Sequence, residues 1–474
     1  MIDTQAIRTK ILDLAMRGHL TERVPEDETA NELMSRIQAE KQLLISAGKI
    51  RKEKTLSDIT EDEKPFEIPE NWTWVRLGTA FCVEMGQSPD GSSVSSSNEG
   101  IEFHQGKIFF GAKYINDSGQ RTTRATKIAE PNSVLLCVRA PVGKVNITQR
   151  IICIGRGLCA IKPVAGVEVD FLYYALTMCE KAFVDQATGS TFAAIGGDII
   201  KKQPVPLPPL TEQKRIVQKI EQAFSVLDTI DALQAQYANN LTVLTSKLID
   251  AAIQGKLTEQ LPEDGTAEEL YQQIQAEKQA LIKAGKIKRE NPLPVINDID
   301  VPFEIPANWK WVSVGDVCIN IQYGSSQKSS PTGKMPVLRM GNIQSGKIVY
   351  DKLVYTSDDT EIAKYPLEKN DLLFNRTNSM ELVGKTAIYK GERPAIYAGY
   401  LVRLTPLVMD SDYLNYAMQS KYYWDYCRIV RIDSNGQSNI NAEKLKRFVF
   451  PLPPLAEQKR ITARLEETLK MIGV

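Results

Sequence analysis

Few residues in this sequence of 474 could carry catalysis, and none forms a recognisable catalytic or metal-binding group. His19 and His104 are the only histidines, so acid–base chemistry through imidazole has little support. The cysteines include no Cys-x-x-Cys pair, and a zinc site needs Cys and His ligands at short spacings. We expect no metal site and interpret the thiols as free and buried. The seven cysteines are Cys82, Cys137, Cys153, Cys159, Cys179, Cys318 and Cys427.

Two Gly-Lys motifs resemble part of a phosphate-binding loop. Gly384-Lys385-Thr386 has Ser379 where such a loop has its first glycine, and Gly143-Lys144-Val145 lacks the hydroxyl that would hold magnesium. The Asn/Asp-Pro-Pro-Tyr signature of amino-methyltransferases is absent. Pro89-Asp90 has no convincing downstream partner for a nuclease metal site. We therefore expect no catalytic residue and no cofactor bound by this chain.

Nucleic-acid binding is better supported, because the basic residues are unevenly distributed. The chain as a whole has a net charge of zero. Residues 100–165 nevertheless contain ten Lys/Arg against three acidic residues, and residues 303–450 contain 19 against 15. A local basic excess is expected of a DNA-binding face, although a solvated cationic surface would look the same.

The candidate DNA contacts are polar residues on Gly-rich loops of these two segments. Asn, Gln and Arg can make bidentate contacts with base edges, and Lys suits phosphate. In the first segment the candidates are Lys107, Lys113, Arg121, Arg124, Lys144, Ser190 and Thr191. In the second they are Gln322, Tyr323, Arg339, Asn342, Asn375, Arg376, Asn378, Asn435 and Gln437.

The elements that must position these loops occur twice in the chain. Pro206–Leu210 and Glu212–Ile216 return 245 residues later, as Pro451–Leu455 and Glu457–Ile461. Ile37–Gln42 and Pro65–Pro69 return 237 residues later, as 274–279 and 302–306. The two offsets together exceed the chain length by eight residues, so one copy is continuous and the other is split between the termini. This arrangement predicts a circular layout with two pseudo-equivalent halves.

The repeated segments have helical periodicity. Apolar residues from Ile216 to Leu248 recur at steps of three or four, which predicts one helix over Glu212–Gln254, about 64 Å long, ending at Gly255. Its long apolar stripe needs a helical partner, and the split copy, 457–474 with 1–17, is the expected antiparallel one. Thr29 and Thr266 each start a second helix with a capping box. We interpret Pro206–Leu210 as a stiff spacer that aims the long helix, and 51–64 and 288–300 as linkers.

The predicted fold class is α+β, with two pseudo-symmetric α/β recognition modules separated by two long antiparallel helices. Each module opens with a Trp pair, Asn71-Trp72-Thr73-Trp74 or Asn308-Trp309-Lys310-Trp311, followed by short β-branched stretches and Gly-rich loops. The expected domains are a split helical region at 1–65 that pairs with 455–474, a module at 66–205, a central helical region at 206–300, a module at 301–450 and a distal helix at 451–474.

The sequence also contains no membrane span or secretory signal. Hydrophobic residues make up 43% of the chain, which is typical of a soluble globular protein. No stretch approaches the roughly 18 apolar residues of a transmembrane helix, and residues 1–10 lack the features of a signal peptide. We expect a cytoplasmic protein.

The Pro-Leu-Pro-Pro-Leu-x-Glu-Gln-Lys-Arg-Ile segments at both module exits, Pro141–Val145, the Thr-Gly-Ser-Thr run at 188–191 and the split repeat resemble the specificity subunits of type I restriction-modification systems. The resemblance covers essentially the whole chain. It implies two target-recognition domains that each read one half of a bipartite, asymmetric DNA site, with conserved helices setting the spacer. It also implies two docked modification (methyltransferase) subunits and recruited restriction (nuclease-translocase) subunits. S-adenosylmethionine, ATP and Mg²⁺ would be bound by those partners, and the specificity subunit would be non-catalytic.

Three alternatives remain open. A stand-alone nuclease or methyltransferase would transfer methyl groups or cut DNA without partners. An interaction scaffold would show no specific, salt-sensitive DNA binding. The specificity subunit of a methylation-only or related defence system would be indistinguishable at the level of this sequence.

Overall fold

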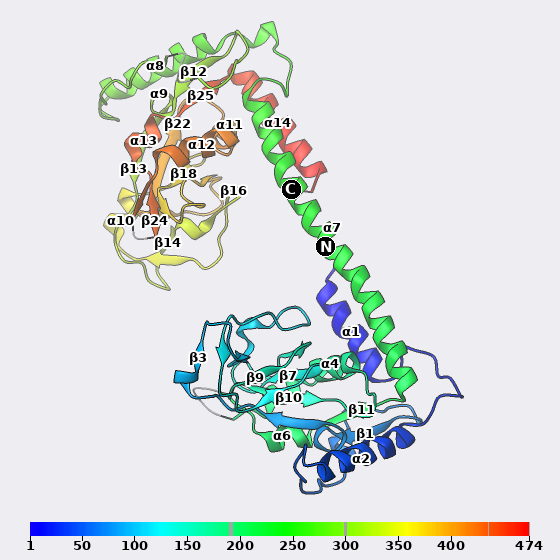
Figure 1. The fold of residues 1–474 in the computed structure, drawn as a ribbon. Helices are drawn as coiled ribbons and strands as arrows, with labels where there is room; N and C mark the ends of the chain where they lie inside the picture. The colour runs from blue at the N-terminus through cyan, green and yellow to red at the C-terminus, as the bar shows by residue number, and fades with distance from the viewer. Residues whose placement is uncertain (189–192, 298–300, 435, 474) are drawn as a thin grey trace. The chain divides into compact units, whose positions relative to one another are not determined.

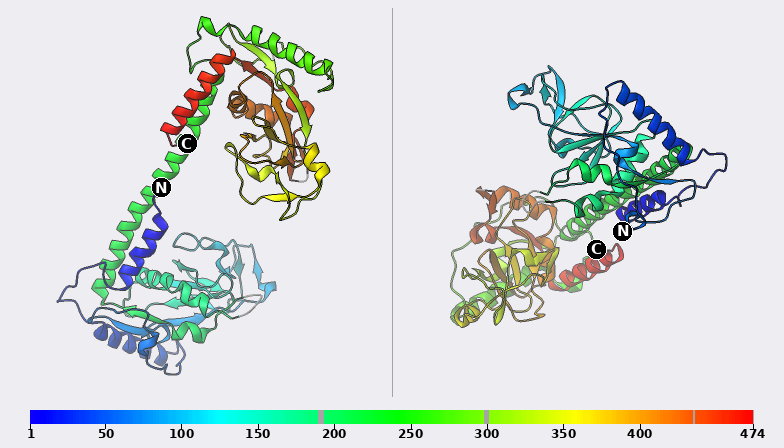
Figure 2. Two further views of the ribbon diagram at one scale, coloured as in Figure 1. Left: turned by 180° about the vertical axis from the view of Figure 1, so that it is seen from behind. Right: turned by 90° about the horizontal axis from the view of Figure 1, so that it is seen from below.

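The computed structural model describes residues 1–188, 193–297, 301–434 and 436–473. The chain divides into two compact units, Met1–Ala235 and Gln236–Val474, and each combines a mixed α/β module with helices (Figures 1 and 2). The boundary falls inside the long helix α7 (Leu210–Ile253), which agrees with the predicted helix within two residues at each end. The prediction of mixed helix and strand in two repeated modules is confirmed.

In unit 1 the helix α1 (Thr4–Met16) runs antiparallel to the first half of α7. Thr4 Oγ1 donates to Asp231, and Arg8 forms ion pairs with Asp228 at 2.7 Å and Asp231 at 2.9 Å. Leu12 and Met16 pack in one core with Ile216 and Ile220 of α7, so this part of the apolar stripe has its helical partner. Farther along the stripe, Leu233 and Tyr237 are exposed. The second helix, α2 (Ala30–Ser46), starts at the predicted Thr29 capping box.

Unit 2 uses the same kinds of element. The helix α14 (Leu455–Met471) contributes Ile461 and Leu465 to a core shared with Ile249 and Ile253 of α7. The second helix, α8 (Ala267–Lys283), starts at the Thr266 capping box. Among the described helices, none is long and apolar enough to cross a membrane.

The module of unit 1 has three sheets, whose strand orders are β1-β11, β2-β10-β7-β8 and β3-β5-β4-β9-β6. The β-branched stretches at 133–138 and 144–148 contain β7 and β8. The elements are β1 (Thr73–Arg76), α3 (Leu77–Ala80), β2 (Cys82–Met85), η2 (Gly91–Ser93), β3 (Val94–Ser95), β4 (Ile101–His104), η3 (Lys107–Phe109), β5 (Arg121–Thr122), β6 (Ile128–Ala129), β7 (Ser133–Cys137), β8 (Val145–Thr148), β9 (Ile152–Ile154), β10 (Leu158–Lys162), α4 (Val169–Met178), α5 (Glu180–Asp185), α6 (Gly197–Lys202) and β11 (Pro204–Leu207).

The module of unit 2 has four sheets, ordered β12-β25, β13-β22-β18-β20-β16-β15, β17-β14-β21 and β19-β24-β23. The β-branched stretches at 371–374 and 385–389 overlap β18 and β20. The elements are β12 (Lys310–Ser313), α9 (Val314–Val317), β13 (Cys318–Tyr323), β14 (Met335–Leu338), η6 (Met340–Asn342), β15 (Ile343–Gln344), β16 (Gly346–Ile348), β17 (Val354–Thr356), α10 (Asp359–Lys364), β18 (Leu372–Asn375), β19 (Thr377–Asn378), β20 (Thr386–Ile388), β21 (Ile396–Tyr397), β22 (Leu401–Pro406), α11 (Ser411–Ala417), α12 (Lys421–Val430), β23 (Ile432–Ser434), β24 (Gln437–Asn439), α13 (Ala442–Lys446) and β25 (Val449–Leu452).

The structure adds detail to two expectations about connecting segments. Part of the proline-rich spacer is a strand, because Pro206 and Leu207 lie in β11 and pair with β1. Its prolines are tolerated there because β11 belongs to a two-stranded sheet and has an unpaired edge. The predicted linker 51–64 contains only the short 3-10 helix η1 (Glu61–Glu63) and lies against the module. Buried Arg76 donates to the carbonyls of Ser57 and Asp58 and holds this segment against the module.

The repeated Glu-Gln-Lys-Arg-Ile segment makes the same contacts in both units. Glu212 and Glu457 are fully buried, and each accepts a hydrogen bond at 2.9 Å from the indole Nε1 of a Trp, Trp72 in unit 1 and Trp309 in unit 2. The next residue, Gln213 or Gln458, donates to the proline carbonyl five residues earlier, at 2.8 Å. These contacts lie where a connector helix, α7 in unit 1 or α14 in unit 2, leaves its module.

The arginine and isoleucine of the motif are also accounted for. Arg215 pairs with Asp27, and Arg460 pairs with Asp264, each through both Nη atoms of the guanidinium group. Ile216 and Ile461 are completely buried. The repeated residues are therefore those whose side chains connect the helix, the loop and the module.

Removing the buried carboxylate should destabilise one unit selectively. Glu457→Ala leaves the indole N–H of Trp309 without its acceptor, and it also removes the acceptor of the Thr258 hydroxyl and one acceptor of Gln260 Nε2. We expect a loss of about 1–3 kcal/mol in the free energy of unfolding, measured by denaturant titration with Trp fluorescence. Glu466→Ala, at an exposed position of the same helix, is the matched control. Equal stability of the two variants would contradict this assignment.

Candidate nucleic-acid interface

The two modules present equivalent positions at the C-terminal end of one central strand. In unit 1, Cys137 ends β7; its N–H donates to Lys144 O at 2.8 Å and its carbonyl accepts from Gly143 N at 2.9 Å. In unit 2, Asn375 ends β18 and makes the same two bonds with Lys385 and Gly384, at 2.8 and 2.9 Å. We call these positions the strand-end sites.

Cationic residues from different loops lie near the strand-end site of unit 1. The Cys137 thiol lies against the Arg139 carbonyl at 3.1 Å and close to the backbone of Lys107. Lys107 and Arg139 are exposed, and neither side chain has a hydrogen bond or ion pair within the described part of the chain. Lys144 is 51% exposed and pairs with Glu180 at 2.7 Å. The site therefore presents positive charge to solvent, as phosphate binding requires.

Arg139 is a candidate that the sequence reasoning missed. It lies in the loop that also carries Gly143 and Lys144, so its place in that motif could have identified it. Its backbone pairs with Ala194, which also pairs with Thr188. The predicted residues Ser190 and Thr191 belong to the segment between those two and lie outside the described residues.

The strand-end site of unit 2 brings together residues that are far apart in sequence. The Arg376 guanidinium lies 4.5 Å from the centre of the Tyr323 ring, and the Tyr323 hydroxyl accepts from Ala442 N at 3.0 Å. Asn378 in β19 is opposite Ser438 in β24, the strand that begins with exposed Gln437. Four predicted residues, Tyr323, Arg376, Asn378 and Gln437, thus lie on adjoining segments. Asn435 lies outside the described residues.

Two predicted contacts in unit 2 are wrong, because these amides serve the fold. Asn342 is buried; its Oδ1 accepts from Arg339 N at 2.9 Å, and its Nδ2 donates to the carbonyls of Val349 and Asp351. Asn375 is completely buried and donates to Leu382 O at 3.4 Å. Neither amide reaches the surface.

The remaining predicted residues make other contacts or lie elsewhere on the modules, except that Gln322 directly precedes Tyr323 in β13. Lys113 is 18% exposed and pairs with Asp170 and Glu221, so its charge is used between the module and α7, and the pKa of its ammonium group is raised despite burial. Arg121 pairs with Asp117 at 2.9 Å. Three others are distributed along the modules: Arg124 and Arg339 are exposed, and Gln322 is half-buried in β13.

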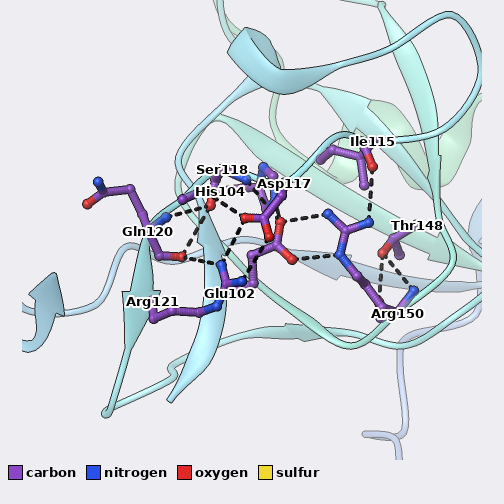
Figure 3. A network of polar contacts seen from close by, with 10 residues as sticks. Glu102, His104, Ile115, Asp117, Ser118, Gln120, Arg121, Thr148 and Arg150 are labelled. Carbon is purple, nitrogen blue, oxygen red and sulfur yellow. Dashed lines mark hydrogen bonds and ion pairs between the residues drawn. The ribbon is translucent and has the colours of Figure 1, made fainter. Parts of the chain in front are cut away.

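Unit 1 also contains a buried charged network, shown in Figure 3. Glu102 in β4 accepts from Arg150 Nε at 2.6 Å and Nη2 at 2.7 Å, from Ser118 N at 3.1 Å, and contacts His104 Nε2 at 2.6 Å. Arg150 also donates to the Ile115 carbonyl at 3.1 Å. The network joins β4 to the segments around Ser118 and Arg150.

The protonation states follow from burial and hydrogen bonding. Burial opposes ionisation of Glu102, but the hydrogen bonds from Arg150 and His104 outweigh it, and the pKa of the carboxyl is lowered. Burial lowers the pKa of His104 and outweighs the raising effect of Glu102. A neutral imidazole that donates from Nε2 leaves Nδ1 as an acceptor, and Nδ1 is buried with no partner among the described atoms. No group of three or more His, Cys, Asp or Glu in the described ranges could hold a metal ion.

This arrangement describes a class of protein with two equivalent sites on two repeated modules and a helical connector fixed to each. The family model for the type I restriction modification DNA specificity domain matches residues 69–237 and 306–472. The chain therefore belongs to the family of type I restriction-modification specificity subunits, and the predicted role in DNA sequence recognition is confirmed.

The chain is also similar to individual proteins of known name. The chain is 26% identical to the type I restriction enzyme EcoEI specificity subunit of Escherichia coli over 98% of this chain and 89% of that protein. It is 28% identical to the EcoAI specificity subunit of the same species, over 98% and 88%. Among solved structures, the crystal structure of the HsdS subunit from Thermoanaerobacter tengcongensis aligns with 49% of this chain and 51% of its own. The sequence identity is 27%, and the TM-score between the two structures is 0.33.

Acid should destabilise unit 1 through His104. Its pKa is lower in the folded state, so the unfolded chain binds a proton first and stability falls as the pH drops below about 6.5 towards the folded pKa. The lowered pKa of Glu102 adds a loss in the same direction at lower pH. We expect His104→Gln to be less sensitive between pH 7 and 5 than the wild type, measured by denaturant unfolding. His19→Gln, at the exposed histidine, should retain the wild-type dependence, and identical slopes for the two variants would refute the role of His104.

Proposed function

We propose that this chain is the non-catalytic subunit that selects the DNA site for a type I restriction-modification complex, each module reading one half of a bipartite, asymmetric sequence. The observation that carries the proposal is the pair of equivalent strand-end sites with different residues. In unit 1 the site is cationic, with Lys107, Arg139 and Lys144; in unit 2 it presents Arg376 together with amides. Equivalent positions with different side chains suit two readers of two different half-sites.

The identical contacts of the connector support a role in assembly. Two methyltransferase subunits would dock on the repeated helices, and nuclease-translocase subunits would join this core. S-adenosylmethionine, ATP and Mg²⁺ would be bound by those partners. The layout we propose is circular and pseudo-two-fold, with the predicted domains 1–65, 66–205, 206–300, 301–450 and 451–474, and the complex would work in the cytoplasm. A methylation-only system would use the same subunit in the same way.

The two strand-end sites should respond differently to substitution. In the assembled complex, Lys107→Ala with Lys144→Ala should weaken binding to all sequences and reduce the slope of log K against log salt by about one per lost phosphate contact. Asn378→Ala or Gln437→Ala should instead relax discrimination in the second half-site, by about 1–3 kcal/mol for a bidentate contact. Binding is measured by fluorescence anisotropy on duplexes carrying the site found by genome-wide adenine-methylation mapping. Lys52→Ala, at an exposed position outside the module, is the control, and a first half-site that changes with Gln437→Ala would contradict the assignment.

The length of α7 should determine the spacer between the half-sites. A four-residue insertion after Asn240, at an exposed position of α7, lengthens the helix by about 6 Å and adds roughly one turn. We expect methylation mapping to show an altered spacer with both half-sites unchanged. Altered half-sites would refute the proposal that the helix acts as a ruler.

A further inference from the structure

The strand-end site of unit 2 carries several large apolar and aromatic side chains that remain exposed. Large apolar residues that gather on the surface mark interaction sites more often than isolated ones do. Each member of the group is at least 37% exposed. They are Tyr323 (40%), Met380 (49%), Leu382 (37%), Tyr400 (49%) and Ile432 (59%).

Hydrogen bonds place these residues on the segments around Arg376. The Arg376 N–H donates to the Tyr400 carbonyl at 3.0 Å, and the guanidinium lies over the Tyr323 ring. Arg431, which precedes Ile432, donates to the Met380 carbonyl at 3.1 Å.

Leu382 and Ile432 lie on the same set of segments. The Leu382 carbonyl accepts from Asn375, the last residue of β18. Ile432 is opposite Asn439 in β24, and Asn439 is opposite Thr377. The five residues, two of them aromatic, therefore lie on segments next to the end of β18, together with Arg376 and Arg431.

Unit 1 has a different surface at the equivalent positions. The strand pairings make Met85 equivalent to Tyr323, and the bond from Val138 N to Gly157 O is equivalent to that from Arg376 N to Tyr400 O. Val138 is buried, and Gly157 has no side chain. The first module thus has cations at this position but neither the aromatic rings nor the stacked guanidinium.

We propose that the second module opens a base step of its half-site and holds an unstacked base on the platform formed by Tyr323, Arg376 and Tyr400, whereas the first module binds stacked duplex. The inference rests on the proposed function and adds a specific mode of reading to one half of it. Aromatic rings and guanidinium planes bind unstacked bases by their π faces. Apolar side chains such as Met380 can enter an opened step and offset part of the energy of unstacking.

Chemical probing of the assembled complex on its methylation-mapped duplex tests the inference. Permanganate modifies unstacked thymines and hydroxylamine modifies unstacked cytosines, so both half-sites are read in one experiment. We expect several-fold greater modification in the second half-site than in free duplex, and duplex-level modification in the first half-site. A thymine that faces a target adenine extruded by the methyltransferase would react in both half-sites and is scored separately.

Substitutions distinguish the platform from general binding. Tyr400→Ala and Met380→Ala should abolish the extra modification, and Tyr400→Phe, which keeps the ring, should retain it. Val295→Ala, at an 81% exposed residue outside the strand-end site, should behave as wild type. If the complex binds and methylates a bipartite site but its second half stays at the duplex level, or if Tyr400→Ala leaves the pattern unchanged, the inference is wrong. If no bipartite site is bound or methylated, the proposed function itself fails.

Discussion

The hydrogen bond between a buried carboxylate and a tryptophan indole is the contact on which each unit depends. Glu212 lies at the start of α7, and Trp72 lies next to β1, the first strand of the module. A fully buried anion is unfavourable unless donors surround it. Trp72 Nε1, Asn71 Nδ2 and Thr21 Oγ1 supply them, from the module and from the loop after α1. One carboxylate therefore requires the helix, the loop and the module to be in register at the same time.

Close packing around this contact explains why neighbouring positions also recur. Gly18 has φ +70°, and a Cβ there would lie 2.3 Å from Pro69 Cγ; Gly255 has the same φ and the same distance to Pro306 Cγ. A side chain at either glycine would be strained by the backbone conformation and would also clash with the proline. The repeated Gly and Pro are thus parts of one junction, although they lie 51 positions apart in the sequence. Repetition of these residues is a consequence of geometry.

The sequence predicted the connector well and the reading surface only in part. Helices and capping boxes depend on local periodicity and on side chains three residues apart, so α7, α2 and α8 could be read from the chain. Surface placement depends on tertiary packing. Asn342 and Asn375 have the residue type and loop setting of DNA contacts, but in the fold their amides satisfy backbone groups. The same signal, an amide in a Gly-rich loop, fits both roles, and only the backbone path decides between them.

The modules are free to diverge because the same backbone can be stabilised by different chemistry. His104 in β4 is opposite Ile154, and Leu338 in β14 is opposite Tyr397, in matching parallel pairs. In unit 1 this strand pair carries the Glu102 network, and in unit 2 it carries buried Leu338 and Tyr397. Hydrogen bonds in a charged network must be aligned, whereas an apolar cluster has no such requirement. The loops next to the two strand pairs are therefore held by different interactions. Because neither solution involves the Trp–Glu junction, a module can change what it presents at its strand end while its attachment to the connector stays the same.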